Sequence, residues 1–211
     1  MMTITLRGST GTYYFKYFVE REDLIGAFSM AYLLALASGA AITPILTRFM
    51  DKKALLSVLM LAVGVLSVGF YFIPKDQIAL MFVVQVLIGL CLGPKSPLVF
   101  SMYADTADYS EWLNGRRATA MVFSAAAFSQ KLGGAFAGAM IGWVLASMGY
   151  VANEQQSDAS VNGIIFLVTV IPAVFAFIAV WCIRFYPLDS NQLSQVQADL
   201  ADRKGSQEWS Q

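Results

Sequence analysis

The chain has 211 residues, of which 57% are hydrophobic and only 13% are charged. Soluble domains average about 45–50% apolar and about 25% charged residues, so this composition predicts a membrane protein. The 14 basic and 14 acidic residues give a formal charge of zero, and there is no histidine, which argues against nucleic-acid binding and excludes His-based triads and His-ligated zinc.

The chain opens with residues 1–19, which carry Arg7 and Lys16 among aromatic residues. This segment is too short and too polar for a complete membrane span, so we interpret it as part of a helix. Two hypotheses remain for its aromatic residues, among them Tyr14. They form a belt at the membrane interface, or they line a pore.

Three apolar runs follow. Residues 24–47 carry no charge and are long enough to cross about 30 Å of hydrocarbon. Residues 54–74 and 77–100 are predicted as the next two spans, joined by a tight turn that makes them antiparallel neighbours. The GPKSP sequence at residues 93–97 contains two prolines, which remove backbone donors. Irregular backbone at membrane depth is tolerated where it is buried in protein or faces water, so this sequence predicts a hinge or a cavity wall.

Residues 101–117 are predicted as a charged loop. Carboxylates close to arginines favour ion pairing over catalysis or metal binding, so we interpret the loop as one side of a membrane gate. The alternative is a solvated charged loop with no such role. The predicted gate residues are Asp105, Asp108, Glu111, Arg116 and Arg117.

The fourth predicted span, residues 118–149, has Lys131 in its interior. A lysine at mid-membrane costs about 2.5–3.5 kcal/mol on insertion scales, so it is expected to face a wet cavity or a partner charge. We predict that Lys131 and the adjacent Gln130 line a cavity. The alternative is that Lys131 forms an ion pair that locks two parts of a larger protein together.

The remaining segments are a polar loop at 150–162, a fifth span at 163–183 and a tail at 184–211 that contains a short amphipathic helix. Basic residues concentrate near residues 48–53, in the 101–117 loop and in the tail. By the positive-inside rule these parts are predicted to be cytoplasmic, and the 150–162 loop, which has no basic residue, external.

Several motifs carry a family resemblance. They are ADTADYSEW at residues 104–112 followed by Arg117, then Lys131 and Gly133, and YYFKY at residues 13–17. With these motifs the chain resembles the glycoside–pentoside–hexuronide family of sugar–cation symporters, within the major facilitator superfamily. The resemblance is to the C-terminal half of a melibiose-permease-like transporter.

The resemblance implies an all-α integral membrane fold made of helices 7 to 12, with helix 7 truncated. It implies a bacterial inner-membrane location, a sugar or glycoside substrate, and Na⁺ or H⁺ as the coupling cation, with no cofactor and no metal. It also implies a missing N-terminal six-helix half as a partner. The substrate and cation cavity would include Lys131, Gln130, Ser96 and Tyr14. Ser96 stands where the melibiose-transporting branch has a tryptophan, which argues against galactoside specificity.

We therefore expect half of a symporter that does not transport without its other half. The alternative is a truncated or split membrane scaffold with no transport activity. An enzyme is not expected, because the sequence offers no nucleophile–base pair or metal cluster and its only polar constellation is the acidic and basic segment at 101–117.

Overall fold

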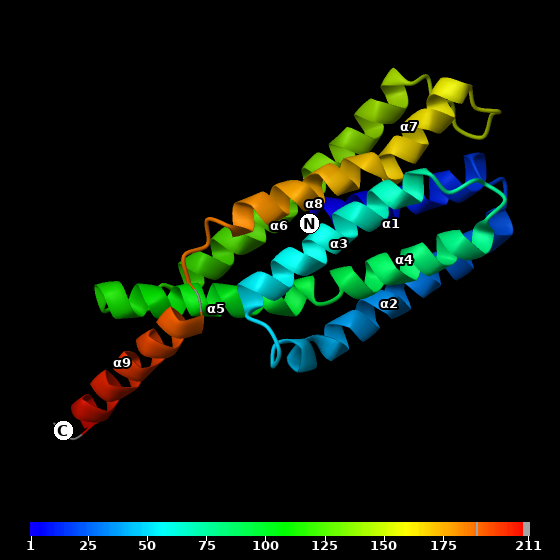
Figure 1. Ribbon diagram of the computed structural model, residues 1–211. Coiled ribbons are helices and arrows are strands. Elements are labelled where there is room, and N and C mark those ends of the chain that lie inside the picture. The colour runs from blue at the N-terminus through cyan, green and yellow to red at the C-terminus, as the bar shows by residue number, and fades with distance from the viewer. Residues whose placement is uncertain (189, 209–211) are drawn as a thin grey trace.

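The computed structural model describes residues 1–188 and 190–208, and within them the chain is helical with no strand (Figure 1). The elements are α1 (Met2–Tyr17), η1 (Glu22–Leu24), α2 (Ile25–Leu46), α3 (Lys52–Tyr71), α4 (Ile78–Leu92), α5 (Lys95–Asn114), α6 (Thr119–Ser147), α7 (Asp158–Val168), α8 (Val170–Ile183) and α9 (Ser190–Glu208). The predicted all-α fold is confirmed.

Within the described residues, four helical stretches are long and apolar enough to cross a membrane, namely Glu22–Leu46, Lys52–Tyr71, Ile78–Asn114 and Asp158–Ile183. The helix α6 has 29 residues, so its length alone is enough to cross a membrane. Its serines, glycines, Gln130 and Lys131 make it less apolar than the other four. The fourth predicted span is therefore a continuous helix with a partly polar surface.

The structure corrects the prediction of a loop at residues 101–117. Helix α5 continues through this segment to Asn114 and ends at Gly115, which has the positive φ of 68° that glycine adopts without strain. Asp105, Asp108 and Glu111 are three residues apart, a spacing that places them on one face of a helix. The charge density predicts a loop over residues 101–117. In the structure, residues 101–114 are helical and the connection to α6 consists of residues 115–118.

The fifth predicted span, residues 163–183, also differs from the helices that the structure shows there. It consists of α7 and α8, which meet at Thr169, and α7 begins at Asp158 inside the predicted 150–162 loop. Ser157 caps α7, because its side chain accepts a hydrogen bond from the amide of Ser160 at 3.3 Å. The break follows from Pro172, which has no N–H to donate to the carbonyl of Val168 four residues earlier.

The helices pack as close pairs, with α3 against α8 and α2 against α4, while α1 lies against α6, α7 and α8. Glycine allows the closest approach. A side chain at Gly39 would overlap the carbonyl of Leu90, and one at Gly93 would overlap the carbonyl of Leu36. The prolines beside Gly93 separate α4 from α5 at this crossing.

Helix α9 forms the helix predicted in the tail. It lies against α5 at the end of the molecule where α5 terminates (Figure 1). Its apolar residues Val196 and Leu200 are buried, as is Leu188 before it. Residues 189 and 209–211 of the predicted 184–211 tail lie outside the described residues.

Candidate functional site

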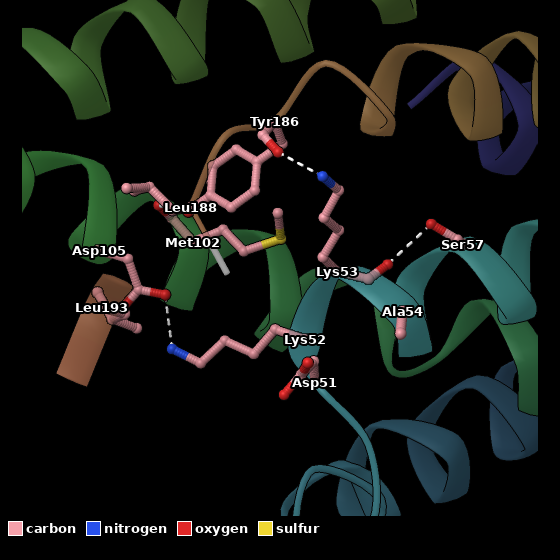
Figure 2. A pocket seen from close by; sticks show the side chains of 10 residues that line it. All are labelled: Asp51, Lys52, Lys53, Ala54, Ser57, Met102, Asp105, Tyr186, Leu188 and Leu193. Atoms are coloured by element: carbon pink, nitrogen blue, oxygen red, sulfur yellow. Dashed lines mark hydrogen bonds and ion pairs between the residues drawn. The ribbon is translucent and has the colours of Figure 1, made fainter. Parts of the chain in front are cut away.

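A charged cluster lies where the middle of α5 meets the start of α3. Asp105 is buried on α5, with a side chain that is 8% exposed, and its carboxylate accepts a hydrogen bond from Lys52 Nζ at 2.6 Å (Figure 2). Lys52 is the first residue of α3, so this ion pair joins two helices that are 53 residues apart in the sequence. The predicted gate residue Asp105 thus pairs with a lysine outside the predicted gate segment.

A pocket of 270 Å³ opens beside this ion pair. Lys53 lines its wall and donates to the carbonyl of Tyr186 at 2.6 Å (Figure 2). It also donates to the carbonyl of Arg184 at 3.4 Å. These carbonyls follow the end of α8, where backbone acceptors lack helical partners, so the lysine serves as a cap. The pocket is lined by Asp51, Lys52, Lys53, Ala54, Ser57, Met102, Asp105, Tyr186, Leu188 and Leu193.

Tyr186 closes the pocket on the side of α5. Its hydroxyl is 3.5 Å from the carbonyl of Met102, to which it donates. Burial raises the pKa of the Tyr186 hydroxyl, and the neighbouring carboxylate of Asp105 raises it further, since both disfavour a phenolate at this position.

The other predicted gate residues form a second, more exposed group. Arg117 pairs with Asp108 at 2.7 Å and lies 3.8 Å from Glu111. The arginine side chain is 51% exposed, so each pair is expected to contribute only about 0–1 kcal/mol to stability. Arg116 forms no hydrogen bond or ion pair with any of the described residues. The structure therefore brings Asp108, Glu111 and Arg117 together and leaves Arg116 outside the group.

Helix α9 is fastened to the same end of α5 by Trp112. The indole Nε1 of Trp112 donates to Asp199 at 2.9 Å, and Arg203 donates to the Trp112 carbonyl at 3.1 Å. The buried Val196 and Leu200 lie on the same helix. The tail is thus part of the charged end of the bundle.

The predicted cavity residues on α5 and α6 are separated. Gln130 is half-buried and lines a groove of 360 Å³ together with Lys95 and Tyr103. Lys131 is exposed on α6, and among the described residues it has no hydrogen bond or ion pair. Ser96 is exposed in the first turn of α5. These three side chains remain candidates for a cavity, and Gln130 lines a groove.

The structure does not place Tyr14 on a cavity. Its side chain is 1% exposed within a cluster of aromatic residues, where its ring centroid is 5.5 Å from that of Phe70 and 5.0 Å from that of Phe18. The reason is that Tyr14 lies on the face of α1 that packs against the rest of the bundle. The cavity role predicted for Tyr14 does not agree with this position.

Sequence reasoning missed the role of Arg7, which is 1% exposed in the middle of the bundle. Its guanidinium donates to the Val168 carbonyl at 2.8 Å, to the Gln85 side-chain oxygen and, at 3.4 Å, to the Ser67 hydroxyl. The Val168 carbonyl is the acceptor released by Pro172, so Arg7 replaces the missing backbone donor. An arginine in a membrane helix and a proline in a distant one were the signals that could have suggested this contact.

Comparisons with known proteins agree with this architecture. Residues 1–190 match the family described as MFS/sugar transport protein. The chain is 33% identical over 206 residues to the inner membrane symporter YicJ of Escherichia coli K12, and the match covers 97% of this chain and 45% of YicJ.

Two further relatives are named for what they transport. The putative glycoside/cation symporter YagG of Escherichia coli K12 is 28% identical over 203 residues, which cover 96% of this chain and 44% of YagG. The isoprimeverose transporter of Lactiplantibacillus pentosus is 31% identical over 203 residues, which cover 96% of this chain and 42% of that protein. The chain thus spans somewhat less than half the length of these three relatives.

Proposed function

This chain belongs to the family of MFS/sugar transport proteins, and on that premise we propose that it forms the C-terminal half of a cation-coupled sugar symporter. The observation that carries the proposal is the match of 97% of this chain to 45% of a symporter. In transporters of this superfamily, two six-helix halves enclose the substrate near the middle of the membrane and move against each other. This chain would supply one wall of the cavity.

The charged end of α5 suits the role of a gate. The Lys52–Asp105 pair joins α3 to α5, and the Arg117 group joins α5 to the turn that precedes α6. The exposed Arg117 and Arg116 are available for charges on the other half, because a surface ion pair is weak enough to break and form again during a transport cycle. Rearrangement of these pairs would open and close that side of the cavity.

The side of the membrane follows from the distribution of basic residues. The α2–α3 connection with the first turn of α3, the turn after α5 and the tail together hold eight of the 14 lysines and arginines, and such segments remain in the cytoplasm. We place the gate and α9 on the cytoplasmic side of the bacterial inner membrane. The connection between α6 and α7 would then be external.

The exposed Lys131 and the groove residue Gln130 are proposed to face the other half. A charge at this depth needs water or a partner, and the described part of this chain offers Lys131 neither a hydrogen bond nor an ion pair. The cavity between the halves would supply that environment. The cargo is a sugar or glycoside, and the coupling ion is Na⁺ or H⁺.

Complementation in cells tests this proposal. The chain would be expressed in bacteria alone and together with the part of YicJ that it does not match, and accumulation of labelled glycosides, isoprimeverose among them, would be measured. We expect accumulation only when both parts are present, and its loss in Lys131→Val at an unchanged amount of membrane-inserted protein. Absence of accumulation with every glycoside and both parts present would favour a scaffold without transport activity.

A further inference from the structure

Another cavity, separate from the gate, lies between α1, α2 and α4. It has a volume of 210 Å³, and we name it the Arg7 cavity. Gly8, Ser29 and Leu33 on its rim are exposed, so the cavity reaches the surface of the chain. Its lining consists of Ile4, Arg7, Gly8, Gly11, Phe28, Ser29, Tyr32, Leu33, Leu36 and Gln85.

The charge of Arg7 is not balanced within the described part of the chain. Its hydrogen-bond partners are a backbone carbonyl, an amide oxygen and a hydroxyl, all uncharged. No described carboxylate forms an ion pair with it. The Phe70 ring, 5.2 Å from the guanidinium carbon, adds attraction without adding a negative charge. A guanidinium is protonated at every physiological pH, and a buried charge without a counter-ion is costly.

Two buried polar atoms at this cavity also have no hydrogen-bond partner among the described residues. They are Arg7 Nε and the Tyr32 hydroxyl. Arg7 is 1% exposed and Tyr32 is 5% exposed, so their polar atoms are largely withdrawn from solvent. The Nε atom can only donate, and the hydroxyl can donate as well. Two donors and a net positive charge together are complementary to an oxyanion.

We propose that the Arg7 cavity binds a small molecule through a carboxylate, which acts as the counter-ion of Arg7. The Arg7 Nε and the Tyr32 hydroxyl would donate to the carboxylate oxygens, and Gly8 and Gly11 would leave room for the rest of the molecule. This inference does not rest on the proposed function, because it concerns a cavity built wholly from this chain. The carboxylate could belong to a sugar acid or to a simple organic acid.

The size of the cavity agrees with such a ligand. A water molecule occupies about 30 Å³ in the liquid, so 210 Å³ corresponds to about seven waters. This volume is below the range of drug-sized sites, about 300–1,000 Å³, and holds a carboxylate with several further atoms. Water alone would satisfy the two donors and would leave the charge of Arg7 unbalanced.

Calorimetric titration of the purified chain in lipid nanodiscs tests the proposal. The probes are sodium acetate, sodium D-glucuronate and D-glucose, with sodium chloride added to hold the sodium concentration constant. We expect D-glucuronate to bind at least about tenfold more tightly than D-glucose, because a hydrogen bond to a charged group contributes more than one to a neutral group. Acetate shows whether the carboxylate belongs to a simple organic acid or to a sugar acid. Binding of both anions indicates a site for simple carboxylates, and binding of D-glucuronate alone indicates a sugar acid.

Two variants locate the binding. Tyr32→Phe removes only the hydroxyl and should weaken anion binding by about tenfold, whereas Tyr71→Phe, at an exposed tyrosine on α3, should leave it unchanged. Arg7→Gln removes the charge and should abolish binding; where this variant does not fold, Tyr32→Phe carries the test. Absence of anion binding in the wild type, equal binding of D-glucose and D-glucuronate, or unchanged binding in Tyr32→Phe would overturn the proposal. Equal binding of the two sugars would do so without contradicting the symporter function.

Discussion

The contact between Arg7 and Val168 depends on Pro172, and a double-mutant cycle measures that dependence. In an uninterrupted helix the amide of residue 172 would donate to the carbonyl of Val168, but proline has no N–H. Arg7 Nη1 donates to this carbonyl instead, at 2.8 Å. In Arg7→Met the carbonyl therefore loses its partner, and a buried acceptor without a partner costs about 1–3 kcal/mol.

Pro172→Ala supplies the backbone donor that Arg7 replaces. We therefore expect Arg7→Met to lower the free energy of unfolding by about 1–3 kcal/mol less in the Pro172→Ala background than in the wild type. The lost contact with Gln85 and the removed charge affect both backgrounds and cancel in the cycle. The assay is equilibrium unfolding of the four proteins in mixed micelles, followed by far-ultraviolet circular dichroism.

The matched control uses Pro44, which also lies inside a helix, in α2, and is not a partner of Arg7. Arg7→Met and Pro44→Ala should have additive effects within about 0.3–0.5 kcal/mol. A coupling between Arg7 and Pro172 no larger than that of this control would refute the account of the helix break.

Three further outcomes are expected. Lys52→Met should lower the free energy of unfolding by at least about 1 kcal/mol more than Arg117→Met, because it leaves the buried Asp105 unpaired while Arg117 is half-exposed. Trp112→Phe should increase amide hydrogen exchange in α9, measured by mass spectrometry, because it removes the indole hydrogen bond to Asp199 and leaves the hydrogen bond from Arg203 to the backbone carbonyl of residue 112. The raised pKa of Tyr186 means that the unfolded chain loses this proton first, so stability should fall as pH rises above about 10, and less steeply in Tyr186→Phe.

Most of the membrane helices could be predicted from the sequence, because a charge-free run long enough to cross the bilayer is rarely anything but a membrane span. The prediction failed at residues 101–117, where charge was interpreted as a loop although the acidic residues follow helical spacing. The predicted span ended at residue 100, whereas α5 continues through the acidic residues as far as Asn114. Charged residues are compatible with a helix that leaves the apolar layer, so charge alone does not mark a helix end.

The candidate site was less predictable because its contacts join distant parts of the chain. The Lys52–Asp105 pair spans 53 residues, although both residues were predicted on the same side of the membrane. Arg7 and Val168 are separated by 161 residues, and the carbonyl of Val168 is available only because of Pro172. Tyr14 was placed in a cavity on sequence grounds, whereas the packing of α1 buries it. Such partners follow from the packing of helices, which local patterns do not define.

The central claim, that this chain is half of a cation-coupled sugar symporter, is tested most directly by uptake in proteoliposomes. Vesicles would contain the chain alone, the complementary part of YicJ alone, or both, and uptake of a labelled glycoside identified in cells would be measured with and without an inward Na⁺ or H⁺ gradient. The account predicts uptake above the equilibrium level only with both parts and an imposed gradient. Gradient-driven uptake by the chain alone, or none with both parts present, would contradict it.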